Sequence, residues 1–236
     1  MATLTQVLAQ LKKKGDPARV KAFAPHGGPQ DMYGVSVADL KGIAKGIRGE
    51  QELAYELYDS GNADAMYLAG MVADGASMTK ARLDSWAKKA PWAMVAEYTV
   101  PGVAAHNRHG RDLALKWMRS KNESIASTGW CTYAGLVAIT PDDALDLEEI
   151  EGLLDTVERG IDAAPNRVRY TMNGFVIAVG TYVKPLSKRA KATARKLGEV
   201  EVDMNGTTCK VPSATEKIGK VEKLGRVGKK RRQVKC

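Results

Sequence analysis

Glu97 and a pair of histidines are the side chains whose types and spacing could do chemistry in this chain. Glu97 is the only acid between Asp84 and Asp112, so it could serve as a general base, although a surface carboxylate would give the same pattern. His106 and His109 lie in one HNRH segment, but a zinc site needs three or four protein ligands and no third one is near. We therefore expect no metal and no cofactor, and Glu97 remains the one catalytic candidate.

The spacing of the cysteines and the absence of cofactor-binding motifs exclude several classes of function. Cys131, Cys209 and Cys236 are not clustered, which is typical of free thiols in a reducing cytoplasm. A P-loop, a GxSxG and a GxGxxG after a strand are all absent, so neither nucleotide hydrolysis nor dinucleotide binding is supported. The apolar run 174–183 is shorter than the ~18 residues of a membrane span, and no secretory leader is visible. We expect a cytoplasmic protein without a membrane partner.

The net charge of +9 is concentrated towards the C-terminus. Residues 1–183 hold 20 Lys and Arg against 22 Asp and Glu, whereas residues 184–236 hold 16 against 5. Cations in the segment 184–197 recur at spacings of 4, 3 and 4, which places them on one face of a helix that contains no acid, and a second cluster follows near the end of the chain. Such cations can meet successive phosphates and release counterions, so the pattern favours nucleic acid as the partner over a merely solvated lysine face. The expected contacts are Lys184, Lys188, Lys191 and Arg195, then Lys229, Lys230, Arg231 and Arg232.

The rest of the chain predicts a succession of helices with short breaks, and therefore an all-α array of antiparallel helices. Ser36 is a good N-cap, and Thr140-Pro141 followed by two acids predicts another helix start. Residues 142–162 carry nine acids and one Arg, so this helix should face away from nucleic acid. The predicted helices cover about 36–49, 50–60, 63–74, 79–89, 91–105, 110–120, 123–139, 140–161, 165–183, 184–197 and 213–224.

The pattern changes after residue 198. Apolar and charged residues alternate on both sides of Asn205-Gly206, and both positions of such a turn need positive φ, so we predict a β-hairpin over 199–211. Asn205 and Lys210 would then be exposed for contact with DNA. Residues 226–236 are expected to form a basic tail, disordered when free.

A helix that begins near Pro165 brings cationic and aromatic groups together. Arg167, Arg169, Tyr170 and Asn173 could line a groove in which Tyr170 stacks on a base or sugar. Trp92 follows Pro91 at another helix start. The alternative for Tyr170 and Trp92 is packing against neighbouring helices.

These elements together resemble the DNA alkylation repair family of HEAT-like repeat proteins, whose best-known members are the AlkD-type alkylpurine DNA glycosylases. The resemblance extends over about 35–185 and implies an all-α, HEAT-like solenoid with a concave basic face, here a single domain over 1–225. It also implies binding of damaged duplex DNA against aromatic residues. The matching segments are YGVSVADLKGIAK at 33–45, KKAPWAMVAEYTVPGVA at 88–104, ALKWMRSKN at 114–122 and RYTMNGFVIAVGTYV at 169–183.

The resemblance assigns the site only in part. Trp92 matches the first aromatic residue of the family's cleft, and Phe175 takes the place of its second tryptophan. The family's catalytic aspartate falls on Ala96, and an arginine of the family falls near Ser127. Glu97, one position along, is expected to point about 100° away around the helix.

We therefore expect a DNA-binding member of this family, monomeric, with weak or no base-excision activity, that contacts duplex, damaged or branched DNA through a basic concave groove and the hairpin. The first alternative is an active glycosylase that releases N3- or N7-alkylated purines with Glu97. The second is a protein-binding helical-repeat scaffold.

Overall fold

The computed structural model describes residues 2–234, and within them the chain forms thirteen α-helices and no β-strand. The predicted all-α class is therefore confirmed. The helices are α1 (Leu4–Lys13), α2 (Pro17–Phe23), α3 (Val37–Gly46), α4 (Gln51–Asp59), α5 (Ala63–Val72), α6 (Lys80–Lys89), α7 (Val100–Ala104), α8 (Gly110–Met118), α9 (Glu123–Ile139), α10 (Leu147–Gly160), α11 (Asn166–Tyr182), α12 (Ser187–Leu197) and α13 (Ala214–Lys223).

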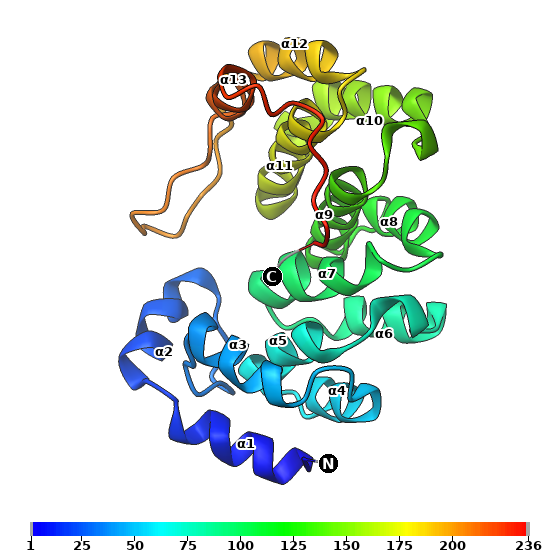
Figure 1. Cartoon of the computed structure of the whole chain (residues 1–236). Helices are drawn as coiled ribbons and strands as arrows, with labels where there is room; N and C mark the ends of the chain where they lie inside the picture. Colours follow the sequence, from blue (N-terminus) through cyan, green and yellow to red (C-terminus); the bar gives the residue numbers. More distant parts are fainter. Residues whose placement is uncertain (1, 235–236) are drawn as a thin grey trace.

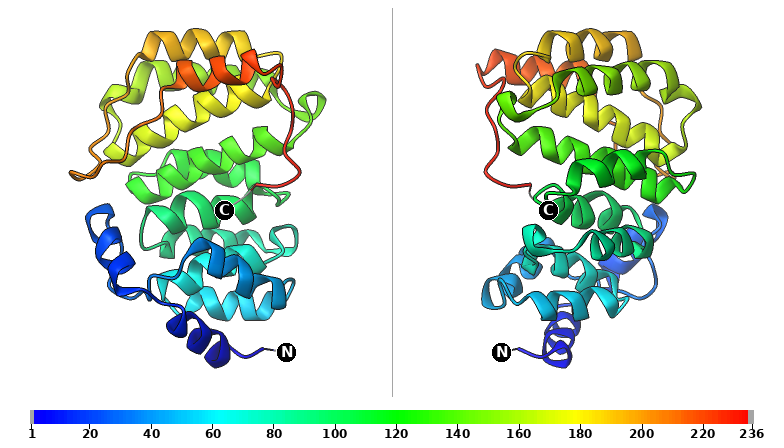
Figure 2. Two further views of the ribbon diagram at one scale, coloured as in Figure 1. Left: turned by 60° about the vertical axis from the view of Figure 1, so that its left-hand side comes forward. Right: turned by 90° about the vertical axis from the view of Figure 1, so that its right-hand side faces the viewer.

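From α4 onwards the helices stack in successive pairs. Helices α5, α7, α9 and α11 lie along one side of the stack, which we call the inner face, and α4, α6, α8 and α10 lie along the other (Figure 1). Helix α2 and the segment 198–213 project from the inner side, one from each half of the stack (Figures 1 and 2). This arrangement gives the molecule one long face that is bounded at both ends.

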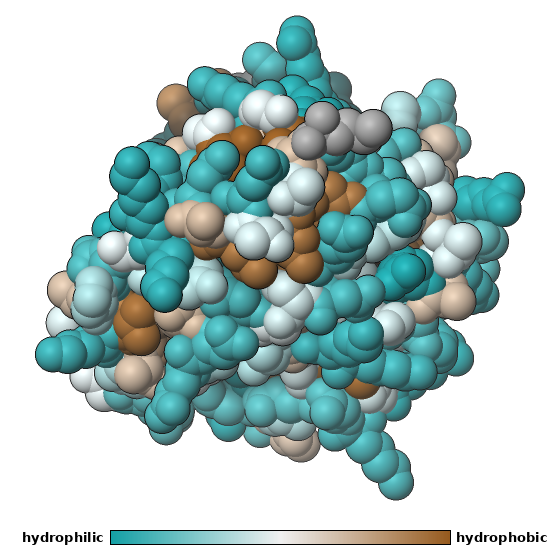
Figure 3. Space-filling view, turned by 90° about the horizontal axis from the view of Figure 1, so that it is seen from below, coloured by the Kyte–Doolittle hydropathy of each residue, from teal (hydrophilic) through white to brown (hydrophobic). Residues whose placement is uncertain are grey.

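Aromatic side chains and close helix contacts fill the core. The rings of Tyr58 and Trp86 stack with centroids 3.9 Å apart, and a single side-chain carbon at Gly180 of α11 would already lie 2.5 Å from Ile218 Cδ1 of α13. Helix α13 can approach α11 this closely only because position 180 is glycine. Apolar residues reach the surface in separate patches among hydrophilic ones on the face that Figure 3 shows.

The helix starts confirm one predicted cap and correct another. Ser36 caps α3, and its hydroxyl accepts the Asp39 N–H. The helix expected to begin at Thr140-Pro141 begins instead at Leu147, since residues 142–144 form a separate 3₁₀ turn and Asp146 supplies the cap. The predicted basic helix begins at Ser187, so Lys184 lies before α12 and not on it.

The predicted β-hairpin over 199–211 is wrong, although its turn forms. Asn205 and Gly206 take the expected positive φ values of 53° and 70°. The two arms do not pair, because their side chains are half-buried or exposed and, apart from Val200, they are not among the residues that pack on the core. Side chains of α11 bind the backbone of the first arm instead: the Asn166 amide donates to Asp203 O and accepts the Asp203 N–H, at 2.8 and 2.7 Å.

The basic tail follows a defined path as far as residue 234. It leaves α13 and runs along the edge of the stack past α11 and α9 towards the end of α7 (Figures 1 and 2). Val234 N–H donates to His106 Nε2 at 3.1 Å, and the Val234 side chain lies against Gly135. Among the described helices, none combines the length and the apolar character needed to cross a bilayer.

Candidate nucleic-acid interface

A π-helical turn places Glu97 on the inner face. Residues Val95–Thr99 form this turn, and Val100 N–H donates to Val95 O, five residues earlier. The wider turn changes the register of the helix, and Glu97 faces α11, where its carboxylate meets Arg167. The expected offset of about 100° from Ala96 stays a prediction. Glu97 is only 6% exposed, which also excludes the surface carboxylate considered from the sequence. Ala96, where the family's aspartate would stand, is buried at 1% exposure.

Arg167 of α11 binds the Glu97 carboxylate with both arms of its guanidinium. Arg167 Nε lies 2.8 Å from Glu97 Oε1, and Nη2 donates to Oε2. The guanidinium also lies over the ring of Tyr170, 4.4 Å from its centroid. The start of α11 is fixed as well, because Glu123 accepts the Arg167 backbone N–H. A bidentate pair of this kind sets the orientation of both side chains.

Burial and pairing act in opposite directions on this carboxyl. Burial raises the pKa of Glu97 above its ordinary value, while the hydrogen bonds from Arg167 lower it. Burial also acts to lower the pKa of Arg167, but its hydrogen bonds and charge attraction to Glu97 prevail and raise that pKa. The thiol of Cys131 lies nearby, and burial raises its pKa well above the usual value, which favours the protonated thiol.

A cavity of about 240 Å³ lies beside this pair on the inner face. Small residues of α9 and α11 leave the space, and tyrosines and the tail surround it. Glu97 is the one acidic side chain among the described residues that line it. The lining includes Tyr98, Pro101, Cys131, Ala134, Gly135, Gly174, Ile177, Tyr182, Arg231 and Val234.

Three residues expected to contact DNA lie in the core. Trp92 is 9% exposed and packs edge-on against Phe23, with centroids 5.3 Å apart. Phe175 is fully buried between Trp130 and Tyr133. Asn173 is buried too, and its amide donates to the carbonyl of the proline that ends the projecting segment. The packing alternative weighed for Trp92 holds, and neither aromatic ring faces the groove.

Other predicted contacts remain accessible at the ends of the groove. Arg169 donates to Glu201 O at 3.2 Å and so holds the projecting segment. Asn205 and Lys210 are exposed on that segment. Tyr170 is half-buried beneath Arg167, with its ring on the same inner face.

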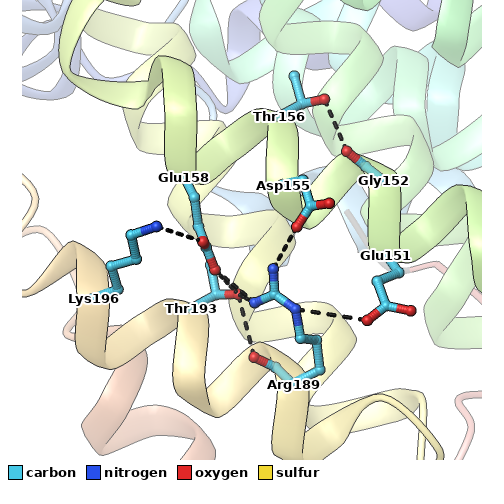
Figure 4. A network of polar contacts seen from close by, with 8 residues as sticks. All are labelled: Glu151, Gly152, Asp155, Thr156, Glu158, Arg189, Thr193 and Lys196. Atoms are coloured by element: carbon cyan, nitrogen blue, oxygen red, sulfur yellow. Dashed lines mark hydrogen bonds and ion pairs between the residues drawn. The ribbon is translucent and has the colours of Figure 1, made fainter.

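The cations of α12 are divided between pairing and exposure. Arg189 binds Glu151, Asp155 and Glu158 of α10, and Lys196 binds Glu158 (Figure 4). The acids of α10 therefore neutralise this side of α12, whereas the sequence alone showed only that α12 itself contains no acid. On the predicted face, Lys191 pairs with Glu222 of α13.

Three cations in α3 and the turn that follows it were missed by the sequence reasoning. Lys41, Lys45 and Arg48 are exposed and line a cavity of about 630 Å³ together with Gln233 and Val234 of the tail. Their spacing of four and three residues was visible in KGIAKGIR, but nothing in the sequence placed α3 beside the C-terminus.

The histidines considered as metal ligands have other partners. His106 accepts the Val234 N–H, and His109 Nε2 lies 3.2 Å from Arg108 Nε. In the part of the chain that the structure describes, no group of three or more His, Cys, Asp or Glu side chains could hold a metal ion.

Known proteins match this chain over most or all of its length. A family model described as DNA alkylation repair enzyme matches residues 7–200. The proteins Lin0241 of Listeria innocua and Lmo0209 of Listeria monocytogenes are each 30% identical over 226 residues, which is 93% of this chain and 97% of each relative. One solved structure aligns over 100% of both chains with a TM-score of 0.91 and 33% identity. It is described as "a new family of proteins related to the HEAT-like repeat DNA glycosylases with affinity for branched DNA structures". The expected HEAT-like helical-repeat fold is thereby confirmed.

Proposed function

This chain belongs to the DNA alkylation repair family, and we propose that it binds duplex, damaged or branched DNA and has weak or no base-excision activity. The inner face, the projecting segment 198–213 and the basic C-terminal region would form the interface. The solved relative described by its affinity for branched DNA supports DNA as the partner, since it matches the whole chain.

The observation that carries the proposal is the pairing of Glu97 with Arg167. Excision of a base leaves positive charge on the sugar, and a free carboxylate near that charge would stabilise the transition state. Here both carboxylate oxygens accept hydrogen bonds from one guanidinium. The pair presents no net negative charge to a sugar on the inner face. A phosphate could still bind Arg167, whose side chain is 28% exposed.

The buried aromatic residues support the same function. A glycosylase of this family holds the damaged nucleotide against aromatic rings, as the resemblance implies. Trp92 and Phe175 are the matching residues, and both belong to the core. The most exposed aromatic residue beside the cavity of the inner face is Tyr98, which is 40% exposed and could stack on a base of the bound DNA.

The experiment that tests this function measures binding and base release in the same samples. Wild-type protein is incubated with a linear duplex that carries N3- and N7-alkylated purines, and with a four-way junction of the same composition. We expect gel shifts with both DNAs, tighter binding to the junction, and no base release above the spontaneous rate. Base release at enzymatic rates would contradict the proposal, and so would the absence of any shift.

The second candidate function is an active alkylpurine glycosylase, and the π-helical turn favours it. This turn brings Glu97 to the inner face, where a carboxylate could assist departure of a cationic base. On this reading, Glu97→Gln abolishes base release, while Glu148→Gln, which removes an exposed carboxylate of α10, leaves it unchanged. The protein-binding scaffold remains the third alternative.

A further inference from the structure

The C-terminal tail lies across the C-terminal ends of the inner helices. A helix leaves the carbonyls of its last turn without partners inside the helix, and the tail supplies donors to three of them. Gly228 N–H donates to Thr181 O of α11, Arg231 N–H to Ala138 O of α9, and Lys230 Nζ to Val137 O of α9. These bonds, together with the one from Val234 to His106, fix the tail along one edge of the stack.

The tail changes the sign of the charge at this edge. Each helix carries about half a negative charge at its C-terminal end, so a row of such ends would repel a polyanion. The tail adds Arg226, Lys229, Lys230, Arg231 and Arg232 at the same place. Lys230 is used for attachment, since it also pairs with Asp142 at 2.7 Å. The remaining four cations are exposed and form no ion pair among the described residues.

Helix α3 and the turn after it continue this row of cations beyond residue 234, the last residue of the tail that the structure describes. A cavity of about 720 Å³ is lined by Arg226, Lys229 and Arg232, among others, and the next cavity, of about 630 Å³, by Lys41, Lys45 and Arg48. Gln233 lines both cavities, so they are neighbours along the edge. We call the seven exposed cations of the tail, α3 and the turn after α3 the edge track: Lys41, Lys45, Arg48, Arg226, Lys229, Arg231 and Arg232.

The charge density of the edge track fits one strand of a DNA backbone. The track crosses the layers of α11, α9, α7, α5 and α3, and packed helices lie 8–10 Å apart, so it is roughly 32–40 Å long. Seven cations over that length give about one charge every 5 Å, which is roughly two cations for every three phosphates of a DNA strand, whose spacing is 3.4 Å of axis. Arg231, whose guanidinium lies 5.1 Å from the centroid of the Tyr182 ring, adds a fixed donor. A flexible acidic peptide can adapt to scattered cations, so it does not require a long row of cations at fixed positions.

The geometry points to the edge track as a binding site for the sugar–phosphate backbone of a DNA segment beside the inner face, over roughly one turn of duplex. This inference rests on the proposed function, because it takes DNA as the partner. It joins tail cations that the sequence predicted as DNA contacts to the cations of Lys41, Lys45 and Arg48, which the sequence did not indicate, and most of the track lies outside residues 7–200, to which the family model applies. In a branched DNA, one arm can follow the track while another lies on the inner face.

The test compares two triple variants with a control of equal charge. The tail variant is Arg226→Ala/Lys229→Ala/Arg232→Ala, and the α3 variant is Lys41→Ala/Lys45→Ala/Arg48→Ala. The control, Lys80→Ala/Arg119→Ala/Arg159→Ala, removes three exposed cations that belong to α6, α8 and α10 or adjoin them. We expect both track variants to bind a four-way junction at least about 10-fold more weakly, with a salt slope lower by about two to three, since each lost phosphate contact removes about 0.9. The control should stay within about 2-fold of the wild type.

A footprint on the wild-type protein gives a second measurement that does not depend on the folding of variants. Lys41, Lys45 and Lys229 should become resistant to acetylation when junction DNA binds, while Lys80 keeps its reactivity. If the wild type binds DNA and the track variants match the control, this inference fails and the proposed function stands. If the wild type binds no DNA, both fail. Equal protection of these lysines by polyglutamate would identify an acidic-peptide surface and overturn the choice of DNA.

Discussion

Arg167 of α11 and Glu97 of the π-helical turn are joined by two parallel hydrogen bonds across the inner face, seventy residues apart in sequence. The Glu97 side chain is 3% exposed and that of Arg167 28%. The pair connects the layer of α7 with that of α11, past the intervening α9, and it adjoins Ala96, on which the family's aspartate falls. The contribution of this pair to the stability of the fold can be measured separately from any contribution to base excision.

Replacement of Arg167 by Met should destabilise the fold by about 2–4 kcal/mol at pH 7, because it leaves a buried carboxylate without its partner. Burial then raises the pKa of Glu97 further, so the variant should be most stable at acidic pH and lose stability as pH rises through that pKa. Urea unfolding at pH 5 and pH 8 measures both effects. The double variant Glu97→Gln/Arg167→Met should recover much of the loss, and an additive loss in the double variant would contradict a coupled pair.

Asp64 should be as important for the N-terminal half. Its carboxylate accepts the backbone N–H groups of Tyr33, Gly34 and Val35 at 2.6, 2.9 and 3.1 Å. The isosteric change Asp64→Asn replaces one acceptor oxygen with a donor, so we expect a loss of about 2 kcal/mol in thermal or urea unfolding. The exposed residue Asp143 provides the matched control, and Asp143→Asn should change stability by less than about 0.5 kcal/mol. Equal effects of the two substitutions would show that the three hydrogen bonds are not needed.

Glu158 should make the packing of α12 on α10 sensitive to acid. Burial acts to raise the pKa of this carboxyl, but hydrogen bonds from Arg189, Lys196 and Thr193 prevail and lower it to about 2. A lowered pKa stabilises the fold above the unfolded value of about 4.3, and this stability is lost as pH falls towards 2. Wild-type protein should therefore lose more stability than Glu158→Gln between pH 4.5 and pH 2.5. Glu148→Gln, at an exposed position of the same helix, should follow the wild type.

The helices were predictable because periodicity and caps act locally, as Ser36 shows. The long-range effects of single-residue features could not be predicted from the sequence. A π-helical turn adds one residue without any mark in the apolar pattern, so the direction of Glu97 could not be inferred. Asn205-Gly206 specified its turn correctly, but strand pairing also needs a face to bury, and the arms have none. The path of the tail depends on free carbonyls at the ends of α9 and α11, which exist only once the helices are stacked.

Asn166 should control the order of the projecting segment and not the stability of the fold. Its amide makes both contacts to the Asp203 backbone, and the segment buries little apolar surface. Asn166→Ala should therefore speed tryptic cleavage after Lys210 several-fold, while the melting temperature changes by less than about 2 °C. Cleavage after Lys80 serves as the internal reference. Unchanged cleavage after Lys210 would show that the segment is held by other contacts.

The attachment of the tail end should depend on pH through His106. Val234 N–H donates to His106 Nε2, which requires a neutral imidazole with a free acceptor nitrogen. Burial lowers the pKa of His106, opposed by the nearby charge of Asp74. A lowered histidine pKa means that this contact is complete above the unfolded value of about 6.5 and is lost as pH falls through the folded value.

Hydrogen exchange of residues 231–234, corrected for the intrinsic rate, measures this release. We expect protection at pH 8 and its loss near pH 5 in the wild type. His106→Phe keeps a ring at this position but cannot accept the hydrogen bond, so its tail end should exchange rapidly at both pH values. His109→Phe is the matched control and should behave like the wild type. Protection that persists at pH 5 in the wild type would mean that the packing of Val234 against Gly135 holds the tail without the histidine.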